Sequence, residues 1–146
     1  MKKGNKSYKV IVDTNIWISF LIGKSLKGLQ NHIDSQKIKI ITCNEQLLEL
    51  SDVFNKPKLK KYFTKLQVNE FFDLLDFSSE KIEICSITNL CRDAKDDYLV
   101  SLSIDSQADY LITGDMDLLV LNKIGKTSII KYADFEIVMN LDNEKL

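Results

Sequence analysis

The sequence predicts an α/β fold: one domain of three layers, α/β/α, built around a mainly parallel central sheet with Rossmann-like architecture. Short segments rich in β-branched residues alternate with segments of helical periodicity, which is the pattern of a parallel sheet covered on both faces. The 146 residues suffice for one ordinary domain, and they contain no internal repeat or linker. Hydrophobic residues make up 45% and charged residues 28%, a balance that excludes disordered, collagen-like and solenoid proteins. We therefore expect residues 1–146 to form a single domain.

The amino-terminal half is expected to begin with a strand that runs directly into a helix. Residues 8–12 are a short β-branched run and predict a buried strand. The polar triplet Asp13-Thr14-Asn15 ends that strand and can cap a helix over 14–22. The remaining elements predicted for this half are a helix over 26–33, a strand over 37–42, a helix from a capping Asn44 to Phe54 that Pro57 stops, and a helix over 67–77.

The carboxyl-terminal half continues the alternation with shorter strands. The predicted elements are, in order, a strand over 81–84, a helix over 96–107 with an acidic first turn, a strand over 109–113 that ends in Gly114-Asp115, a strand over 128–131 and a small helix from Ala133. Parallel strands need such helical crossovers between them, so this order supports the predicted fold class.

Several features predict a cytoplasmic protein without a membrane partner. The longest apolar runs, such as residues 16–22, are far shorter than the roughly 20 residues that span a bilayer. The lysine-rich start is followed by an apolar stretch that soon meets Asp13, so no signal-peptide core is formed. The three cysteines are sparse and lack CxxC spacing, which is typical of reduced thiols and argues against a metal–thiolate site.

The distribution of charged and metal-binding residues restricts the chemistry further. His32 is the only histidine, which excludes zinc sites built from several histidines and leaves oxygen ligands for any bound metal. Between Asp93 and Asp117 there are seven aspartates and one lysine. Such an acidic segment indicates either a cation site or a solvated face, and composition does not choose between them.

Carboxylates from distant parts of the sequence are expected to meet at one edge of the sheet. Asp13 and Asp115 each follow a short hydrophobic strand directly, and the carboxyl ends of parallel strands open onto a ligand crevice. The further candidates are Asp117, two residues beyond Asp115, the pair Asp96 and Asp97, which begin a helix, and Glu49, which borders the apolar stripe of its helix and is placed to reach over the sheet edge.

Such a cluster of carboxylates suits only a few kinds of chemistry. Four or five carboxylates that converge without histidine form a hard-cation site, and Mg²⁺ or Mn²⁺ suits oxygen ligands and phosphate substrates. Clustered anions repel one another and also repel a phosphate. They are therefore tolerable only around divalent cations, which reverse the sign of the local charge. The pattern therefore favours metal-dependent phosphodiester cleavage, in which the metal activates water and stabilises the leaving oxygen.

Each of these residues also has a structural interpretation. Asp13 alone is a helix cap, and Asp96 and Asp97 suit any first helical turn because of the helix dipole. Glu49 alone is a surface glutamate, and only the joint pattern makes it specific. A lysine-rich segment with aromatic neighbours either follows an RNA backbone or coats a solvated helix, and both interpretations stay open. Its lysines are Lys56, Lys58, Lys60 and Lys61.

Four sequence blocks carry a resemblance to a known family. They are Val12-Asp13-Thr14-Asn15, then Glu45 to Leu50 followed by Lys56-Pro57-Lys58-Leu59, then Cys91-Arg92-Asp93 leading to Asp96-Asp97, and finally Thr113-Gly114-Asp115-Met116-Asp117-Leu118-Leu119. With these blocks in this order the chain resembles the PIN-domain family, in particular its single-domain branch of toxin components of bacterial toxin-antitoxin pairs. The resemblance spans about residues 9–135. Ala94 departs from it, since this branch often has proline there.

The resemblance implies a Mg²⁺- or Mn²⁺-dependent endoribonuclease with RNA as substrate, an antitoxin protein as partner and often a homodimer. Carried over residue by residue, it implies four metal-binding catalytic acids, one additional catalytic acid and supporting hydrogen-bond residues. The four are Asp13, Glu49, Asp97 and Asp115, the additional acid is Asp117, and the supporting residues are Asn15, Thr113 and Asp96. The family has one ligand at the Asp96-Asp97 step, and the ungapped run to Asp115 favours Asp97.

Two other classes of function compete with this interpretation. A haloacid-dehalogenase-like phosphatase also has an early aspartate after a strand, but its second aspartate, two residues on, is here Asn15. A non-catalytic PIN-like module that binds RNA or protein would not need the intact acids, and a metal titration discriminates it from an enzyme. A dinucleotide-binding domain is excluded, because no G-x-G-x-x-G follows the first strand. We therefore expect an endoribonuclease that cleaves single-stranded or loop RNA.

Overall fold

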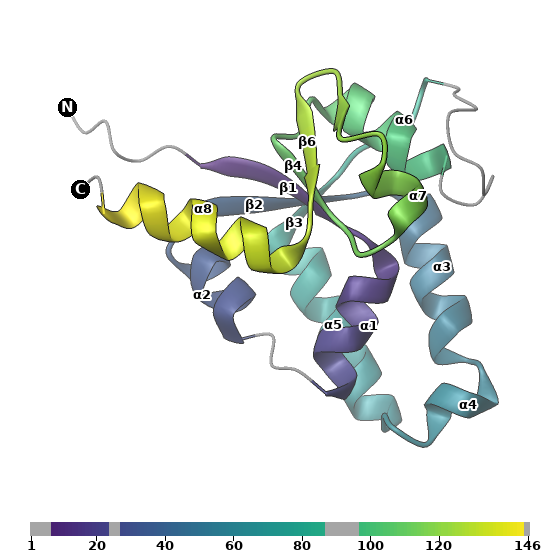
Figure 1. The fold of residues 1–146 in the computed structure, drawn as a ribbon. Coiled ribbons are helices and arrows are strands. Elements are labelled where there is room, and N and C mark those ends of the chain that lie inside the picture. The colour runs from purple at the N-terminus through teal and green to yellow at the C-terminus, as the bar shows by residue number, and fades with distance from the viewer. Residues whose placement is uncertain (1–6, 24–26, 87–96, 145–146) are drawn as a thin grey trace.

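The centre of the structure is a six-stranded sheet of order β3-β2-β1-β4-β6-β5 (Figure 1). A computed structural model describes residues 7–23, 27–86 and 97–144. The strands are β1 (Tyr8–Val12), β2 (Ile38–Thr42), β3 (Ser79–Lys81), β4 (Tyr110–Ile112), β5 (Lys123–Ile124) and β6 (Thr127–Ile130). All neighbouring pairs are parallel except β5 and β6, which are antiparallel. The sheet is therefore mainly parallel, as the sequence predicts.

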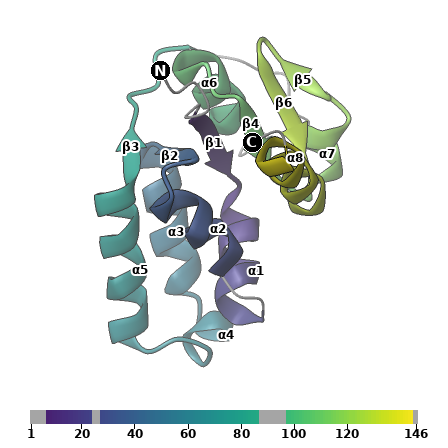
Figure 2. The same cartoon turned by 90° about the vertical axis from the view of Figure 1, so that its left-hand side faces the viewer.

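Helices cover both faces of this sheet. They are α1 (Thr14–Ile22), α2 (Lys27–Asp34), α3 (Asn44–Phe54), α4 (Pro57–Lys60), α5 (Lys65–Ser78), α6 (Asp97–Ser106), α7 (Met116–Leu119) and α8 (Tyr132–Glu144). One hydrophobic cluster joins the sheet to α1, α2, α3, α5 and α8, and a second joins it to α6 and α7. Figure 2 shows α6 on the opposite side of the sheet from α1, α2, α3 and α5. The predicted three-layer α/β/α fold is confirmed.

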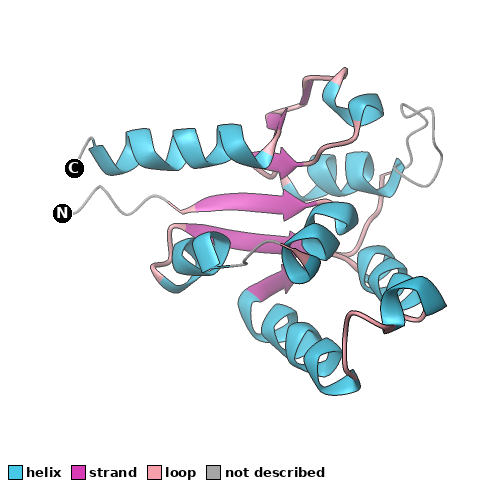
Figure 3. Ribbon diagram, turned by 60° about the horizontal axis from the view of Figure 1, so that its bottom comes forward, coloured by secondary structure: helices cyan, strands magenta, loops and turns pink. Residues whose placement is uncertain are grey.

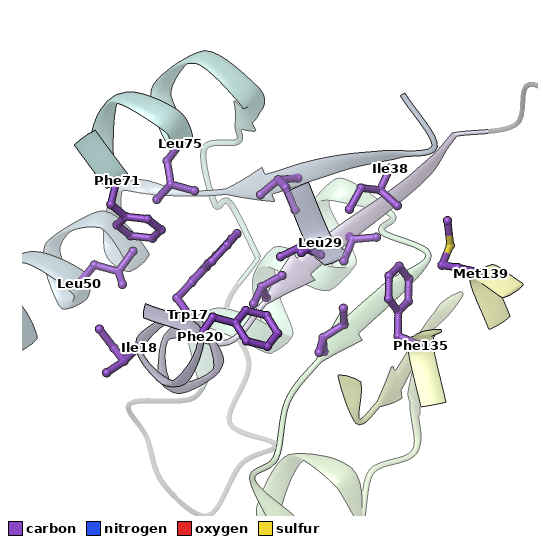
Figure 4. Close-up of a cluster of buried hydrophobic side chains, with 14 of the residues drawn as sticks. Trp17, Ile18, Phe20, Leu29, Ile38, Leu50, Phe71, Leu75, Phe135 and Met139 are labelled. Carbon is purple, nitrogen blue, oxygen red and sulfur yellow. The ribbon is translucent and has the colours of Figure 1, made fainter. Parts of the chain in front are cut away.

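The central strand β1 contributes side chains to both hydrophobic clusters. Val10 and Val12 pack into the first cluster, and Ile11, which points to the other face, packs into the second. Figure 4 shows the first cluster, where Trp17 of α1 and Phe71 of α5 lie side by side with ring centroids 5.5 Å apart. The last three residues of β1, Val10 to Val12, are buried and form a continuous apolar run, whereas Lys9 before them is exposed.

The parallel strands point in one direction, so that their carboxyl ends share one edge of the sheet (Figure 3). In this register Val12 at the end of β1 lies beside Ile112 at the end of β4. The backbone N–H of Asp13 then donates to the carbonyl of Ile112 over 2.9 Å, and that of Thr113 donates to the carbonyl of Ile130 over 3.0 Å. This edge is where the candidate acids of both strands emerge.

The structure corrects several predicted elements. The third strand is Ser79–Lys81 and not 81–84, the carboxyl-terminal helix has 13 residues and is not small, and Cys43 rather than Asn44 occupies the N-cap of α3. The short elements α4, α7 and β5 were not predicted as separate elements. Within the described part of the chain, no helix is both long and apolar enough to cross a membrane.

Candidate acidic active site

Asp13 stands at the centre of the carboxyl edge, directly after β1, and it caps α1. One carboxylate oxygen, Oδ1, accepts the backbone N–H of Asn15 over 3.3 Å. The other, Oδ2, accepts the hydroxyl of Thr113 over 2.7 Å. The residue is only 6% exposed. Helix capping and burial of a carboxylate therefore coincide in one residue, and capping alone does not require the burial.

The pKa of Asp13 reports its surroundings. Burial raises the pKa above its ordinary value, and the hydrogen bonds from Thr113 and Asn15 oppose that rise. The charges of Glu49 and Asp115 raise the pKa of Asp13 further. The structure thus brings the carboxylates of three distant segments into electrostatic contact at one place, with Asp13 as the buried member.

Glu49 reaches this edge from the middle of α3 and is half-buried. Its Oε1 accepts the hydroxyl of Thr14 over 2.8 Å and the hydroxyl of Tyr98 over 2.5 Å. The pKa of the Tyr98 phenol is raised, first by burial and then by its hydrogen bond to Glu49. Glu49 is therefore held at the edge by side chains of two other helices.

A buried glutamine fixes the helix that carries Glu49. The Gln46 side chain is fully buried, and its amide donates to the carbonyl of Val12 over 2.6 Å. Its own carbonyl accepts the hydroxyl of Thr42 over 2.8 Å. Gln46 thereby joins the first turn of α3 to the last residues of β1 and β2, which sets the position of Glu49 relative to Asp13.

After β4, Asp115 is the N-cap of the short helix α7, and Asp117 lies in the first turn of that helix. Oγ1 of Thr113 accepts the backbone N–H of Asp115 over 3.0 Å, and the Asp115 carboxylate accepts the backbone N–H of Asp117 over 2.9 Å. Both aspartates are half-buried. Thr113 therefore contacts Asp13 and Asp115 at once and links the two strand ends.

The other residues implied by the resemblance lie as follows. Asp97 is the first residue of α6 and is half-buried next to Tyr98. Asp96 lies outside the described residues, so the choice between these two acids stays a prediction. Asn15 supports Asp13 through its backbone N–H, while its side chain is exposed. The predicted RNA-binding lysines, Lys56, Lys58, Lys60 and Lys61, are exposed around α4, which lies beyond the far end of α3 from the sheet (Figure 1).

The donor set of this edge matches a hard divalent cation in chemistry. All candidate ligands are carboxylate oxygens, and a cation would relieve the repulsion that Glu49 and Asp115 exert on Asp13. The side chains do not already surround one point: among the described residues, no group of three or more acidic, histidine or cysteine side chains is arranged to hold a metal ion. The acids thus gather at one edge in an arrangement that a cation would have to draw together.

Three residues of this site were not predicted from the sequence: Thr14, Gln46 and Tyr98. Thr14 belongs to the triplet that the sequence assigns to capping, yet its hydroxyl bonds to Glu49. Its position next to Asp13 in the sequence could have indicated that Thr14 belongs to the site. Gln46 and Tyr98 act through contacts between elements far apart in the sequence, and neither residue type reveals such a contact.

The class of the protein follows from comparison of the chain with known proteins. A family model described as "PIN domain" matches residues 9–117. The chain therefore belongs to the PIN-domain family, whose domains are generally nucleases. This membership is evidence against the phosphatase alternative. The uncharacterized protein MJ1680 of Methanocaldococcus jannaschii is 35% identical over 123 residues, which cover 81% of this chain and 77% of that protein.

Two solved structures are similar in fold. VapBC2 from Rickettsia felis, bound to a DNA fragment from the promoter, has a TM-score of 0.56 at 14% identity. The matched region covers 83% of this chain and 96% of the VapBC2 chain. PAE2754 from Pyrobaculum aerophilum also has a TM-score of 0.56 at 14% identity, with 86% of this chain and 85% of that chain covered. At this identity the likeness concerns the fold alone.

Proposed function

We propose that this protein is a divalent-metal-dependent endoribonuclease. The observation that carries the proposal is the buried carboxylate of Asp13, which Glu49 and Asp115 approach at the carboxyl edge of a PIN-domain sheet. A buried acid surrounded by further acids is unfavourable in a protein without a compensating cation. Such an arrangement suits the metal-assisted cleavage of a phosphodiester, because the metal supplies the compensating charge.

Four carboxylates would hold the metal: Asp13, Glu49, Asp97 and Asp115, with Asp117 beside them as an additional acid. A bound Mg²⁺ or Mn²⁺ ion would neutralise the RNA phosphate and activate water for attack on phosphorus. The chain's own contribution is to orient the acids. Thr113 fixes Asp13 and Asp115, and Gln46 fixes the helix of Glu49. The mechanism needs no protein nucleophile, and single-stranded or loop RNA is the substrate class that an open edge would admit.

The proposal extends to the biological role. The structural neighbour from Rickettsia felis is described as VapBC2 bound to a fragment of its promoter, and the resemblance in the sequence is to toxin components. We therefore propose that this chain is the toxin of a toxin-antitoxin pair, that it acts in the cytoplasm, that an antitoxin protein binds it and that it forms a homodimer. Co-purification with the product of an adjacent gene would test whether an antitoxin protein binds this chain.

A cleavage assay with matched variants tests the enzymatic proposal. Wild-type protein is incubated with bulk RNA in EDTA, Mg²⁺ or Mn²⁺, beside Asp13→Asn and the control Asp52→Asn, which alters an exposed aspartate of α3. We expect cleavage only with metal, full activity in the Asp52 variant, and a loss of at least about 100-fold in the Asp13 variant. Cleavage by Asp13→Asn at the wild-type rate would refute the assignment.

A non-catalytic binding module is the second candidate function. It is favoured by one observation, the lack of a preformed group of three metal-binding side chains among the described residues. A Mn²⁺ titration followed by calorimetry discriminates the two candidates. Binding that depends on Asp13 supports the nuclease, whereas RNA binding without any metal binding or cleavage supports the module.

A further inference from the structure

Tyr98 is held between two layers of the fold at the candidate active site. Its ring packs against the hydrophobic cluster on the α6 side of the sheet. Its hydroxyl reaches Glu49, whose helix α3 packs on the opposite face. Thr14, from the first turn of α1, meets the same carboxylate oxygen. Three helices from two layers therefore converge on Oε1 of Glu49.

The protons of this cluster can be assigned from its chemistry. An ionised carboxylate only accepts hydrogen bonds, and each hydroxyl has one proton to donate. Thr14 and Tyr98 therefore both donate to Glu49 when its carboxylate is charged. The hydroxyl oxygens of Thr14 and Tyr98 lie 3.3 Å apart, and in this state no hydrogen bond forms between them. The hydrogen bond from Tyr98 is the shorter of the two, 2.5 Å against 2.8 Å from Thr14.

The two donors occupy one oxygen of the carboxylate and leave the other for a ligand. Among the described residues, both hydrogen bonds to the Glu49 side chain end on Oε1. Oε2 is thus the oxygen that remains for a cation. A glutamate side chain on a helix surface has several rotamers, and two hydroxyls fixed by packing restrict it to one orientation.

We propose that Tyr98, together with Thr14, is a positioning residue that orients the Glu49 carboxylate for binding of the divalent cation. The inference rests on the proposed metal-dependent function. Tyr98 does not bind the metal or the RNA and acts through Glu49. Mutation of a residue that hydrogen-bonds to a metal ligand typically lowers metal affinity by about 10–100-fold.

The test measures Mn²⁺ affinity by calorimetry on the full chain without RNA. Tyr98→Phe retains the ring and removes only the hydroxyl. Tyr132→Phe is a matched control, because the Tyr132 hydroxyl also donates to a glutamate, Glu136, within α8. We expect Tyr98→Phe to weaken Mn²⁺ binding about 10-fold and Tyr132→Phe to leave it unchanged.

A double-mutant cycle separates positioning from general stabilisation. In a Glu49→Gln background, Tyr98→Phe is expected to have no further effect on Mn²⁺ affinity, because the residue through which it acts is already altered. Thr14→Val is expected to weaken binding, and Thr14→Ser, which retains the hydroxyl, to restore it. This second pair keeps the test valid if Tyr98→Phe folds poorly.

The outcomes distinguish the two proposals. If the wild-type chain bound Mn²⁺ in an Asp13-dependent way and Tyr98→Phe bound it equally well, the positioning role alone would be wrong. A lowered melting temperature with unchanged Mn²⁺ affinity would also overturn it, because that result describes a merely structural tyrosine. If the wild-type chain bound no Mn²⁺, both the metal-dependent function and the positioning role would fail.

Discussion

The hydroxyl of Thr113 donates a 2.7 Å hydrogen bond to Oδ2 of Asp13 and so joins the end of β4 to the end of β1. Thr113 is fully buried, and its oxygen also accepts the backbone N–H of Asp115. One side chain thus fixes two candidate acids relative to each other. The same hydrogen bond lowers the pKa of Asp13 and opposes the effect of burial.

Thr113→Val is expected to raise the pKa of Asp13 further, because the variant has the shape of threonine but no donor. Cleavage would then require a higher pH, since Asp13 must be ionised to bind a cation. The free energy of unfolding should fall by about 1–3 kcal/mol, because the N–H of Asp115 loses its buried acceptor. Thr113→Ser should restore both properties. Initial rates across pH and urea unfolding measure them, and equal pH profiles for the valine and serine variants would contradict the expectation.

Asp13 is expected to make the metal-free protein less stable as pH rises. Its pKa in the folded state lies above its ordinary value of 3.8, so between these two values the folded state binds more protons than the unfolded state. The free energy of unfolding therefore falls as pH increases through this window. Asp13→Asn removes the titrating group and should remove that fall, so that the variant is at least as stable as wild type near neutral pH.

Urea unfolding in EDTA between about pH 4 and pH 8 measures this dependence. Asp52→Asn, at an exposed position of α3, serves as the control and should keep the wild-type pH dependence. Parallel stability curves for wild type and Asp13→Asn would show that burial does not penalise the ionised Asp13.

Local signals explain why the start of the fold was predictable. The strand Tyr8–Val12 and the helix Thr14–Ile22 have the predicted bounds, because a β-branched run and a capping aspartate stand in neighbouring residues. Asp13 follows its strand directly, as predicted, whereas β4 ends at Ile112 and Thr113 and Gly114 separate it from Asp115. Fold class and the gathering of these acids follow from this alternation and from the parallel strand direction.

Other features depend on contacts that sequence position does not reveal. The hydrogen bonds to Glu49 come from α1 and α6, and no periodicity within α3 indicates them. β3 was misplaced because the apolar residues Ile82 and Ile84 suggested the strand. They pack against the second hydrophobic cluster outside any strand, while polar Ser79–Lys81 forms the edge strand through its backbone. Elements of two to four residues, such as β5 and α7, are too short for a period to be recognised.

Gln46→Leu is expected to destabilise the protein by about 1–3 kcal/mol, because the Val12 carbonyl and the Thr42 hydroxyl would both lose a buried partner. Leucine is similar in size, so a change in packing contributes little. Leu48→Ala, at a position 67% exposed two residues further along α3, should change stability by less than about 0.5 kcal/mol. Urea unfolding measures both, and equal effects would mean that the buried amide has no special role.

The two interpretations of the lysine-rich segment predict different salt dependences. If Lys58 and Lys60 bind RNA phosphates, replacing both with glutamine should weaken binding to single-stranded RNA. It should also reduce the slope of log K against log salt by about 0.7 for each phosphate that the variant no longer neutralises. The matched control Lys39→Gln/Lys123→Gln removes two other exposed charges. Filter binding by Asp13→Asn protein, which is expected to be inactive, measures the slopes without cleavage. A larger change of slope in the Lys58/Lys60 variant assigns the segment to RNA binding, whereas equal changes in the two double variants make it a solvated helix whose lysines act only through net charge.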